Sequence, residues 1–222
     1  MRIKTETEQL KQAFQNLAEN ESFKETNERL KNGEEPHDMV KTMAMSEHVL
    51  KAMLALGDEV YPGGSLPRQL KELIILNSSI QNSCQFCTKS HIDITKGLGI
   101  SDDPEAFVSE RDKLNDCDQA ALAYQDAIIA DSNRVSQETI SRLRIHFSES
   151  EIVELTFLIG YINMLNWFNN ALGVEYRGEL APWIIGTKLF QEVNIYGKLR
   201  VLTGRCIIHR LLIKHLAGVA QW

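Results

Sequence analysis

The residues with the most chemical potential lie in one short stretch, CQFCTKSH at positions 84–91. On an α-helix, offsets of three and seven residues return to nearly the same face, so Cys84, Cys87 and His91 would share one stripe. Two thiols at this spacing can close into a disulfide. An imidazole one turn away can accept a thiol proton, because this ring titrates near neutral pH. The stretch therefore predicts thiol-based redox chemistry.

Two arguments assign the more reactive sulfur differently. If Asn82 or Ser83 caps the helix, Cys84 lies in the first turn, where free backbone N–H groups and the helix dipole favour a thiolate. Cys87, in contrast, lies one turn before His91, which can remove its proton. We assign the attacking role to Cys87 and the resolving role to Cys84, and the reverse order stays open.

A carboxylate on the preceding segment is placed to support the imidazole. Glu72 lies 12 residues before Cys84 on a separate predicted helix, and a turn at residues 81–83 would fold that helix back. A carboxylate beside His91 would fix the ring's orientation and tautomer and raise its basicity. Arg68, one helical turn before Glu72, is placed to keep that carboxylate ionised.

Helical periodicity recurs along the chain, and no β-hairpin dipeptide separates alternating runs. The breaker YPGG at 61–64 divides two helices, and Ser65 is a candidate cap for the second, with Pro67 early in it. Ser148 and Glu151 have the spacing of a capping box, which opens a long helix reaching Gly173. The sequence therefore predicts an all-α fold.

The predicted domain covers residues 1–182, with a bundle-like core at about 36–181 and a helical N-terminal extension at 1–35. Residues 183–222 differ, because they carry six Lys and Arg residues against one acidic residue. Apolar residues at three- and four-residue spacing predict an amphipathic helix at about 198–217. We expect it to pack on the acidic body or on another subunit; contact with an anionic membrane surface is the alternative.

Composition and charge argue against several classes of protein. The net charge is −6 and the pI is about 5.6, which argues against non-specific nucleic-acid binding. Four cysteines in 222 residues are too few for a disulfide scaffold, and the first residues lack the apolar core of a signal peptide. The longest apolar stretch, 155–168, is shorter than the roughly 20 residues a bilayer requires. We therefore expect a soluble, cytoplasmic protein.

Glu72, Cys84, Cys87 and His91 together follow the pattern E-x11-C-x2-C-x3-H. This pattern resembles the active-site signature of the carboxymuconolactone decarboxylase superfamily, and the cysteine pair is similar to its alkylhydroperoxidase D-like branch. The flanking segments 54–76 and 146–174 also resemble the family. Two features depart from it: some relatives carry a second histidine where this chain has Phe86, and the resemblance stops near residue 182.

The resemblance implies an all-helical bundle that assembles into homotrimers or hexamers. It implies reduction of alkyl hydroperoxides or hydrogen peroxide by the cysteine pair, with an external dithiol, such as a lipoyl-type protein, reopening the disulfide. Glu72, His91 and a water would form the proton relay. No cofactor or metal is expected in this chemistry.

Two other functions remain open at this stage. Glu72 and His91 alone would suit a cofactor-free lactone decarboxylase or related lyase, for which the cysteines are unnecessary. Alternatively, Cys84, Cys87 and His91 offer three zinc ligands, with Glu72 or Cys117 as a fourth, in a metal-stabilised binding protein without catalysis.

Overall fold

The computed structural model describes residues 1–5, 7–19, 23–33 and 36–178. Within these ranges the chain forms helices and turns and no strand, which confirms the predicted all-α class. The helices are α1 (Thr7–Asn16), α2 (Lys24–Lys31), α3 (Asp38–Ala44), α4 (Glu47–Val60), α5 (Arg68–Gln81), α6 (Gln85–Gly97), α7 (Pro104–Ser109), α8 (Asp116–Asp131), α9 (Gln137–His146) and α10 (Glu149–Leu172).

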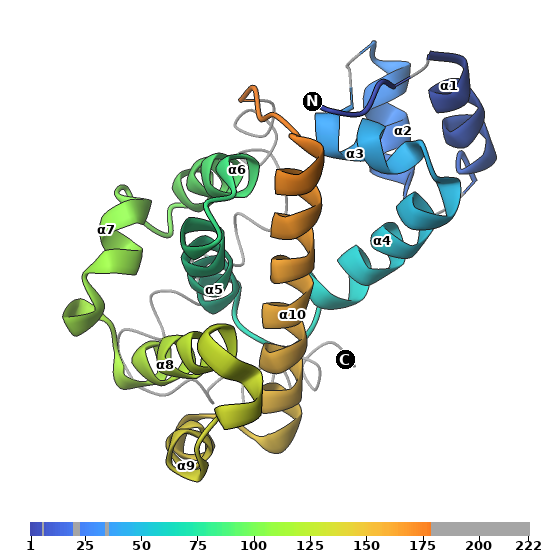
Figure 1. Cartoon of the computed structure of the whole chain (residues 1–222). Helices are drawn as coiled ribbons and strands as arrows, with labels where there is room; N and C mark the ends of the chain where they lie inside the picture. Colours follow the sequence, from blue (N-terminus) through green and yellow to red (C-terminus); the bar gives the residue numbers. More distant parts are fainter. Residues whose placement is uncertain (6, 20–22, 34–35, 179–222) are drawn as a thin grey trace, which may run out of the picture.

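Two helices organise the bundle. Figure 1 shows α10 running through the molecule, with α5 and α6 on one side and α4 on the other. Helix α5 is enclosed by α6, α7, α8 and α10, and every residue from Leu70 to Ser79 on it is buried. Because a buried polar group costs free energy unless it is hydrogen-bonded, the polar side chains of α5 must find partners inside the protein.

The long helix α10 begins and ends as its sequence predicts. At its start the Ser148 hydroxyl accepts the Glu151 N–H, while the Glu151 carboxylate accepts the Ser148 N–H at 2.7 Å. This reciprocal arrangement satisfies two donors that a helix start leaves free. At its end Gly173 adopts a left-handed conformation with φ of 60°, which a residue without a Cβ adopts at little cost.

Two predicted helix caps are wrong. Ser65 does not cap α5, which starts after Pro67, and its hydroxyl donates to Glu154 instead. Neither Asn82 nor Ser83 caps α6, because Asn82 ends α5 and Ser83 turns the chain with a φ of 52°. The N-cap of α6 is Cys84 itself.

The predicted helix at 198–217, and with it the whole extension at 183–222, lies outside the described residues. Among the described helices, none is both long enough and apolar enough to span a bilayer.

Candidate functional site

The cysteine pair lies where α5 turns into α6. Cys84 is the N-cap of α6, and its sulfur accepts the N–H of Cys87 at 3.3 Å. The two cysteines form a disulfide across Cα atoms 5.4 Å apart, and both side chains are buried. After reduction, a thiolate at Cys84 would retain a backbone donor and the positive end of the helix dipole.

Asparagines of α10 hold the turn that carries Cys84. The Asn82 amide donates to Oδ1 of Asn163 at 2.6 Å and of Asn166 at 3.0 Å. Asn170 donates in turn to the backbone carbonyl of Asn82 at 2.8 Å. These contacts explain the unusual number of asparagines on α10, because each of the three fixes the reversal between α5 and α6.

The turn brings Glu72 and His91 together, as their spacing predicts. Oε2 of Glu72 lies 2.7 Å from Nδ1 of His91, and the Glu72 side chain is buried. With Nδ1 donating its proton to the carboxylate, the neutral ring carries its free lone pair on Nε2. Arg68 also contacts the carboxylate, with Nε 2.6 Å from Oε1.

Tyr61 is a site residue that sequence reasoning missed. Its hydroxyl donates to Oε1 of Glu72 at 2.6 Å, accepts from Arg68 at 2.6 Å and lies 3.3 Å from Nδ1 of His91. The Arg68 guanidinium also stacks over the phenol ring, 4.3 Å from its centroid. One sequence signal pointed there: a tyrosine directly before Pro-Gly-Gly, 11 residues ahead of Glu72.

The electrostatics of this cluster fix its charges. Burial opposes ionisation of Glu72, but the positive charge of Arg68, followed by the His91 and Tyr61 contacts, outweighs it and lowers the carboxyl pKa to about 2. Burial raises the pKa of Tyr61 well above 10, so its hydroxyl stays a proton donor. The cluster is therefore an ionised carboxylate with three donors around it.

The loop that carries Tyr61 is fixed by a buried ion pair. Lys71 on α5 lies 2.9 Å from the Glu154 carboxylate of α10 and donates to the carbonyls of Val60 and Gly63. Gly64 lies against this pair with φ of 83°, and a Cβ there would overlap the Glu154 carboxylate. The carbonyls on both sides of Tyr61 are thus tied to the bundle core.

The surroundings of the sulfurs are mainly apolar. Phe86 and Val174 are buried beside the cysteines, and further apolar side chains pack around them (Met39, Phe168, Leu172 and Tyr176). A polar contact comes from Asn169, whose Nδ2 lies 3.3 Å from the Cys87 sulfur. Within the described part of the chain, no hydrogen bond joins either sulfur to His91 or Glu72. The four predicted site residues therefore form two bonded pairs, Cys84–Cys87 and Glu72–His91.

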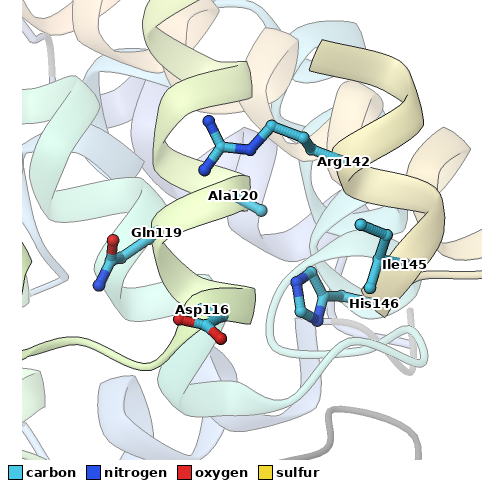
Figure 2. A pocket seen from close by; sticks show the side chains of 6 residues that line it. All are labelled: Asp116, Gln119, Ala120, Arg142, Ile145 and His146. Carbon is cyan, nitrogen blue, oxygen red and sulfur yellow. The ribbon is translucent and has the colours of Figure 1, made fainter. Parts of the chain in front are cut away.

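A pocket of about 260 Å³ lies elsewhere, between α8 and α9. Figure 2 shows its lining side chains, which include Asp116, Arg142 and His146 but none of the predicted site residues. Among the described residues, no three His, Cys, Asp or Glu side chains are grouped so that they could hold a metal ion. This pocket therefore does not contain the predicted site residues of the α5–α6 turn.

Comparison with known proteins gives a family match over the segment that carries the site. The model of the carboxymuconolactone decarboxylase family matches residues 47–108, which include Tyr61, Glu72, both cysteines and His91. The uncharacterised protein YdfG of Bacillus subtilis is 31% identical over 116 residues, which is 49% of this chain and 77% of that protein.

Two solved structures extend the likeness. A protein of unknown function from Agrobacterium tumefaciens, with a suggested antioxidant-defence role of the AhpD type, is 30% identical, with a TM-score of 0.55. That match covers 60% of this chain and 92% of the other. An uncharacterised peroxidase-related protein from Ralstonia eutropha, an alkylhydroperoxidase AhpD core, shares the fold at 17% identity, with a TM-score of 0.64. That match covers 84% of this chain and 97% of the Ralstonia chain.

Proposed function

We propose that this chain, which belongs to the carboxymuconolactone decarboxylase family and its AhpD-like superfamily, is a thiol-dependent peroxidase that reduces hydroperoxides. One observation carries the proposal: a closed Cys84–Cys87 pair lies at the start of α6, the helix that also presents His91 to Glu72. A lyase using Glu72 and His91 alone has no use for the pair, whereas a peroxidase cycle that passes through an internal disulfide needs two thiols.

The first half of the cycle oxidises Cys87. Nε2 of His91, with Nδ1 held by Glu72, removes the Cys87 proton through one bridging water, since no direct hydrogen bond joins ring and sulfur. The thiolate attacks the terminal oxygen of the peroxide. An S–O bond forms, the O–O bond breaks, and the departing alkoxide takes the proton from His91. The products are a sulfenic acid and an alcohol, or water from hydrogen peroxide.

The second half closes and reopens the disulfide. The Cys84 thiolate, stabilised at the N-cap, attacks the Cys87 sulfur, so that an S–S bond forms and hydroxide leaves, to be protonated to water. An external dithiol, for which a lipoyl-type protein is one candidate, then reduces the pair by thiol–disulfide exchange. Glu72 stays ionised throughout, because its pKa is about 2.

The apolar shell favours organic substrates. Phe86, Val174 and their neighbours offer contact area to an alkyl or aryl group and few hydrogen bonds to hydrogen peroxide. We therefore expect a higher kcat/KM for cumene hydroperoxide than for hydrogen peroxide.

The test is hydroperoxide consumption with dihydrolipoamide as reductant. We expect Cys87→Ser to abolish turnover, while Cys84→Ser still forms a sulfenic acid that dimedone traps at Cys87. The reverse trapping pattern would exchange the two roles. Full turnover by both variants would contradict the mechanism.

Two histidine variants, one inside and one outside the proposed site, separate a catalytic effect from a non-specific one. His91→Gln is expected to lower kcat/KM by roughly a hundredfold, the usual contribution of a general base. His146→Gln alters the pocket of Figure 2 and should leave turnover unchanged.

We further propose a homotrimer or hexamer in a reducing, cytoplasmic compartment that supplies the dithiol. Helix α10 leaves several large apolar side chains exposed, among them Phe157 at 53% and Trp167 at 64%. Exposed groups of this size on one helix are typical of contacts between copies. Sedimentation should give a multiple of 25.2 kDa that Trp167→Glu reduces; a wild-type monomer at micromolar concentration would contradict this.

A further inference from the structure

One buried amide of α10 has a hydrogen-bonding pattern unlike that of its neighbours. Asn163 and Asn166 use both amide atoms: each Oδ1 accepts from Asn82, and their Nδ2 atoms donate to Ile159 and Ser79. Asn169, equally buried, donates through Nδ2 to the Cys87 sulfur at 3.3 Å, and more distantly to the sulfur of Met39 at 3.6 Å. Its Oδ1 is buried with no hydrogen-bond partner among the described residues.

An unsatisfied buried carbonyl is costly, so a water or a ligand atom that donates to it would be bound favourably. We propose that Asn169 is a catalytic residue that binds the hydroperoxide: Nδ2 stabilises the Cys87 thiolate, and Oδ1 accepts the hydroxyl of the substrate's terminal oxygen. This inference rests on the proposed peroxidase function and adds a substrate-binding group that Glu72 and His91 do not supply.

The donor half acts on the reduced enzyme. An N–H donor to sulfur is weak while the sulfur is in a disulfide, and becomes a charge-assisted hydrogen bond when the sulfur is a thiolate. The apolar shell around Cys87 strengthens this effect, because a charge-assisted hydrogen bond gains in a medium of low dielectric constant. Asn169 therefore favours ionisation of Cys87 in particular, which supports Cys87 as the attacking sulfur.

The acceptor half orients the substrate. Nδ2 and Oδ1 lie side by side on one planar group, so an O–H that donates to Oδ1 places its oxygen beside the sulfur bound to Nδ2. The thiolate attacks this oxygen, the S–O bond forms, and the O–O electron pair leaves with the alkoxide, which takes the proton held by His91. The peroxide hydrogen stays on the sulfenic oxygen, still donated to Oδ1.

The test measures Cys87 reactivity without peroxide. In the fully reduced full-length chain, iodoacetamide alkylation of Cys87 is followed by peptide mass spectrometry across pH. Asn169→Leu, which keeps the side-chain volume, should slow alkylation at pH 7 roughly tenfold, the loss of one charge-assisted donor. It should lower kcat/KM for cumene hydroperoxide roughly a hundredfold. Asn169→Asp, which keeps an acceptor but loses the donor, should slow alkylation further.

The matched control is Gln125→Met, which removes a buried amide of α8 that bonds Ile74 and Ser78 on α5. It should lower stability but leave Cys87 alkylation within about twofold. If Asn169→Leu does not fold, Asn169→Ser is compared in the same way.

The outcomes separate this inference from the proposed function. Unchanged alkylation and unchanged turnover in a folded Asn169 variant would overturn the inference and leave the peroxidase intact. Slowed alkylation with unchanged turnover would overturn the substrate-binding half. If the wild type consumes no hydroperoxide, the proposed peroxidase function is contradicted, and with it the substrate-binding role of Oδ1. Slowed alkylation of Cys87 in the Asn169 variant would still support the contact between Nδ2 and the thiolate.

Discussion

The hydroxyl of Tyr61 donates a 2.6 Å hydrogen bond to the same Glu72 oxygen that Arg68 contacts. The other oxygen of Glu72 holds His91 at 2.7 Å. Both carboxylate oxygens are thus engaged, which fixes the plane of the carboxylate and with it the direction of the imidazole. The proton relay that we propose therefore includes the 61–67 loop as well as the two helices.

Tyr61→Phe tests this arrangement. Removing the hydroxyl leaves Glu72 bound by Arg68 and His91 but less firmly oriented, so we expect kcat to fall roughly tenfold and stability to fall by about 1 kcal/mol. Steady-state kinetics and chemical denaturation measure the two effects. Tyr124→Phe is the matched control, because Tyr124 is buried and its hydroxyl bonds to Thr156 at 2.7 Å. Equal kinetics in both variants would remove Tyr61 from the relay.

The low pKa of Glu72 predicts a specific dependence of stability on pH. Its folded pKa of about 2 lies below the ordinary value of 4.5, so ionised Glu72 stabilises the fold above pH 4.5. This contribution, about 3 kcal/mol at most, is lost as the pH falls from 4.5 towards 2.

Unfolding free energies of wild type and Glu72→Gln, measured across this range, check the sign. The variant should be the less stable protein above pH 4.5, because Arg68 then lacks its buried partner, and the difference should shrink towards pH 2. A difference that does not vary with pH would show that Glu72 titrates alike in the folded and unfolded states.

Local spacing was sufficient to predict the Glu72–His91 contact. The two residues are 19 positions apart on consecutive helices, so one turn decides whether they meet, and the Arg68–Glu72 pair follows directly from helix geometry. The cap of α6 was predicted wrongly because preferences rank Ser and Asn above Cys. The left-handed Ser83 that displaces the start of α6 has no signal in the sequence.

Contacts between distant segments were beyond sequence reasoning. Asn169 contacts Cys87, which lies 82 positions earlier in the chain. Whether Asn169 faces the cysteines depends on how α10 is rotated about its axis against α5 and α6, and the sequence does not show that rotation. Helical spacing alone does not show which of the α10 asparagines face the α5–α6 turn and which face elsewhere. Tyr61 was not predicted as a site residue for a similar reason, because the direction of its side chain depends on a loop that is bound to α10.

The Lys71–Glu154 pair provides a test of that loop. Lys71→Met leaves a partly buried carboxylate unpaired and frees the Val60 and Gly63 carbonyls, so we expect a loss of about 3 kcal/mol in stability. Kinetics should show a lower kcat, since the loop no longer fixes Tyr61.

Lys71→Met combined with Glu154→Gln removes the unpaired charge and should recover part of the stability but not the kcat. A double variant less stable than Lys71→Met would contradict this account of the ion pair.

The central claim is that Cys84 and Cys87 together transfer two electrons to one hydroperoxide. The most direct measurement is a single turnover: reduced protein is mixed with one equivalent of cumene hydroperoxide, then analysed by thiol titration, peptide mapping and intact mass. We predict one equivalent of alcohol, the loss of the Cys84 and Cys87 thiols together, and a mass lower by two hydrogen atoms. Intact Cys84 and Cys87 thiols with unconsumed peroxide would contradict it.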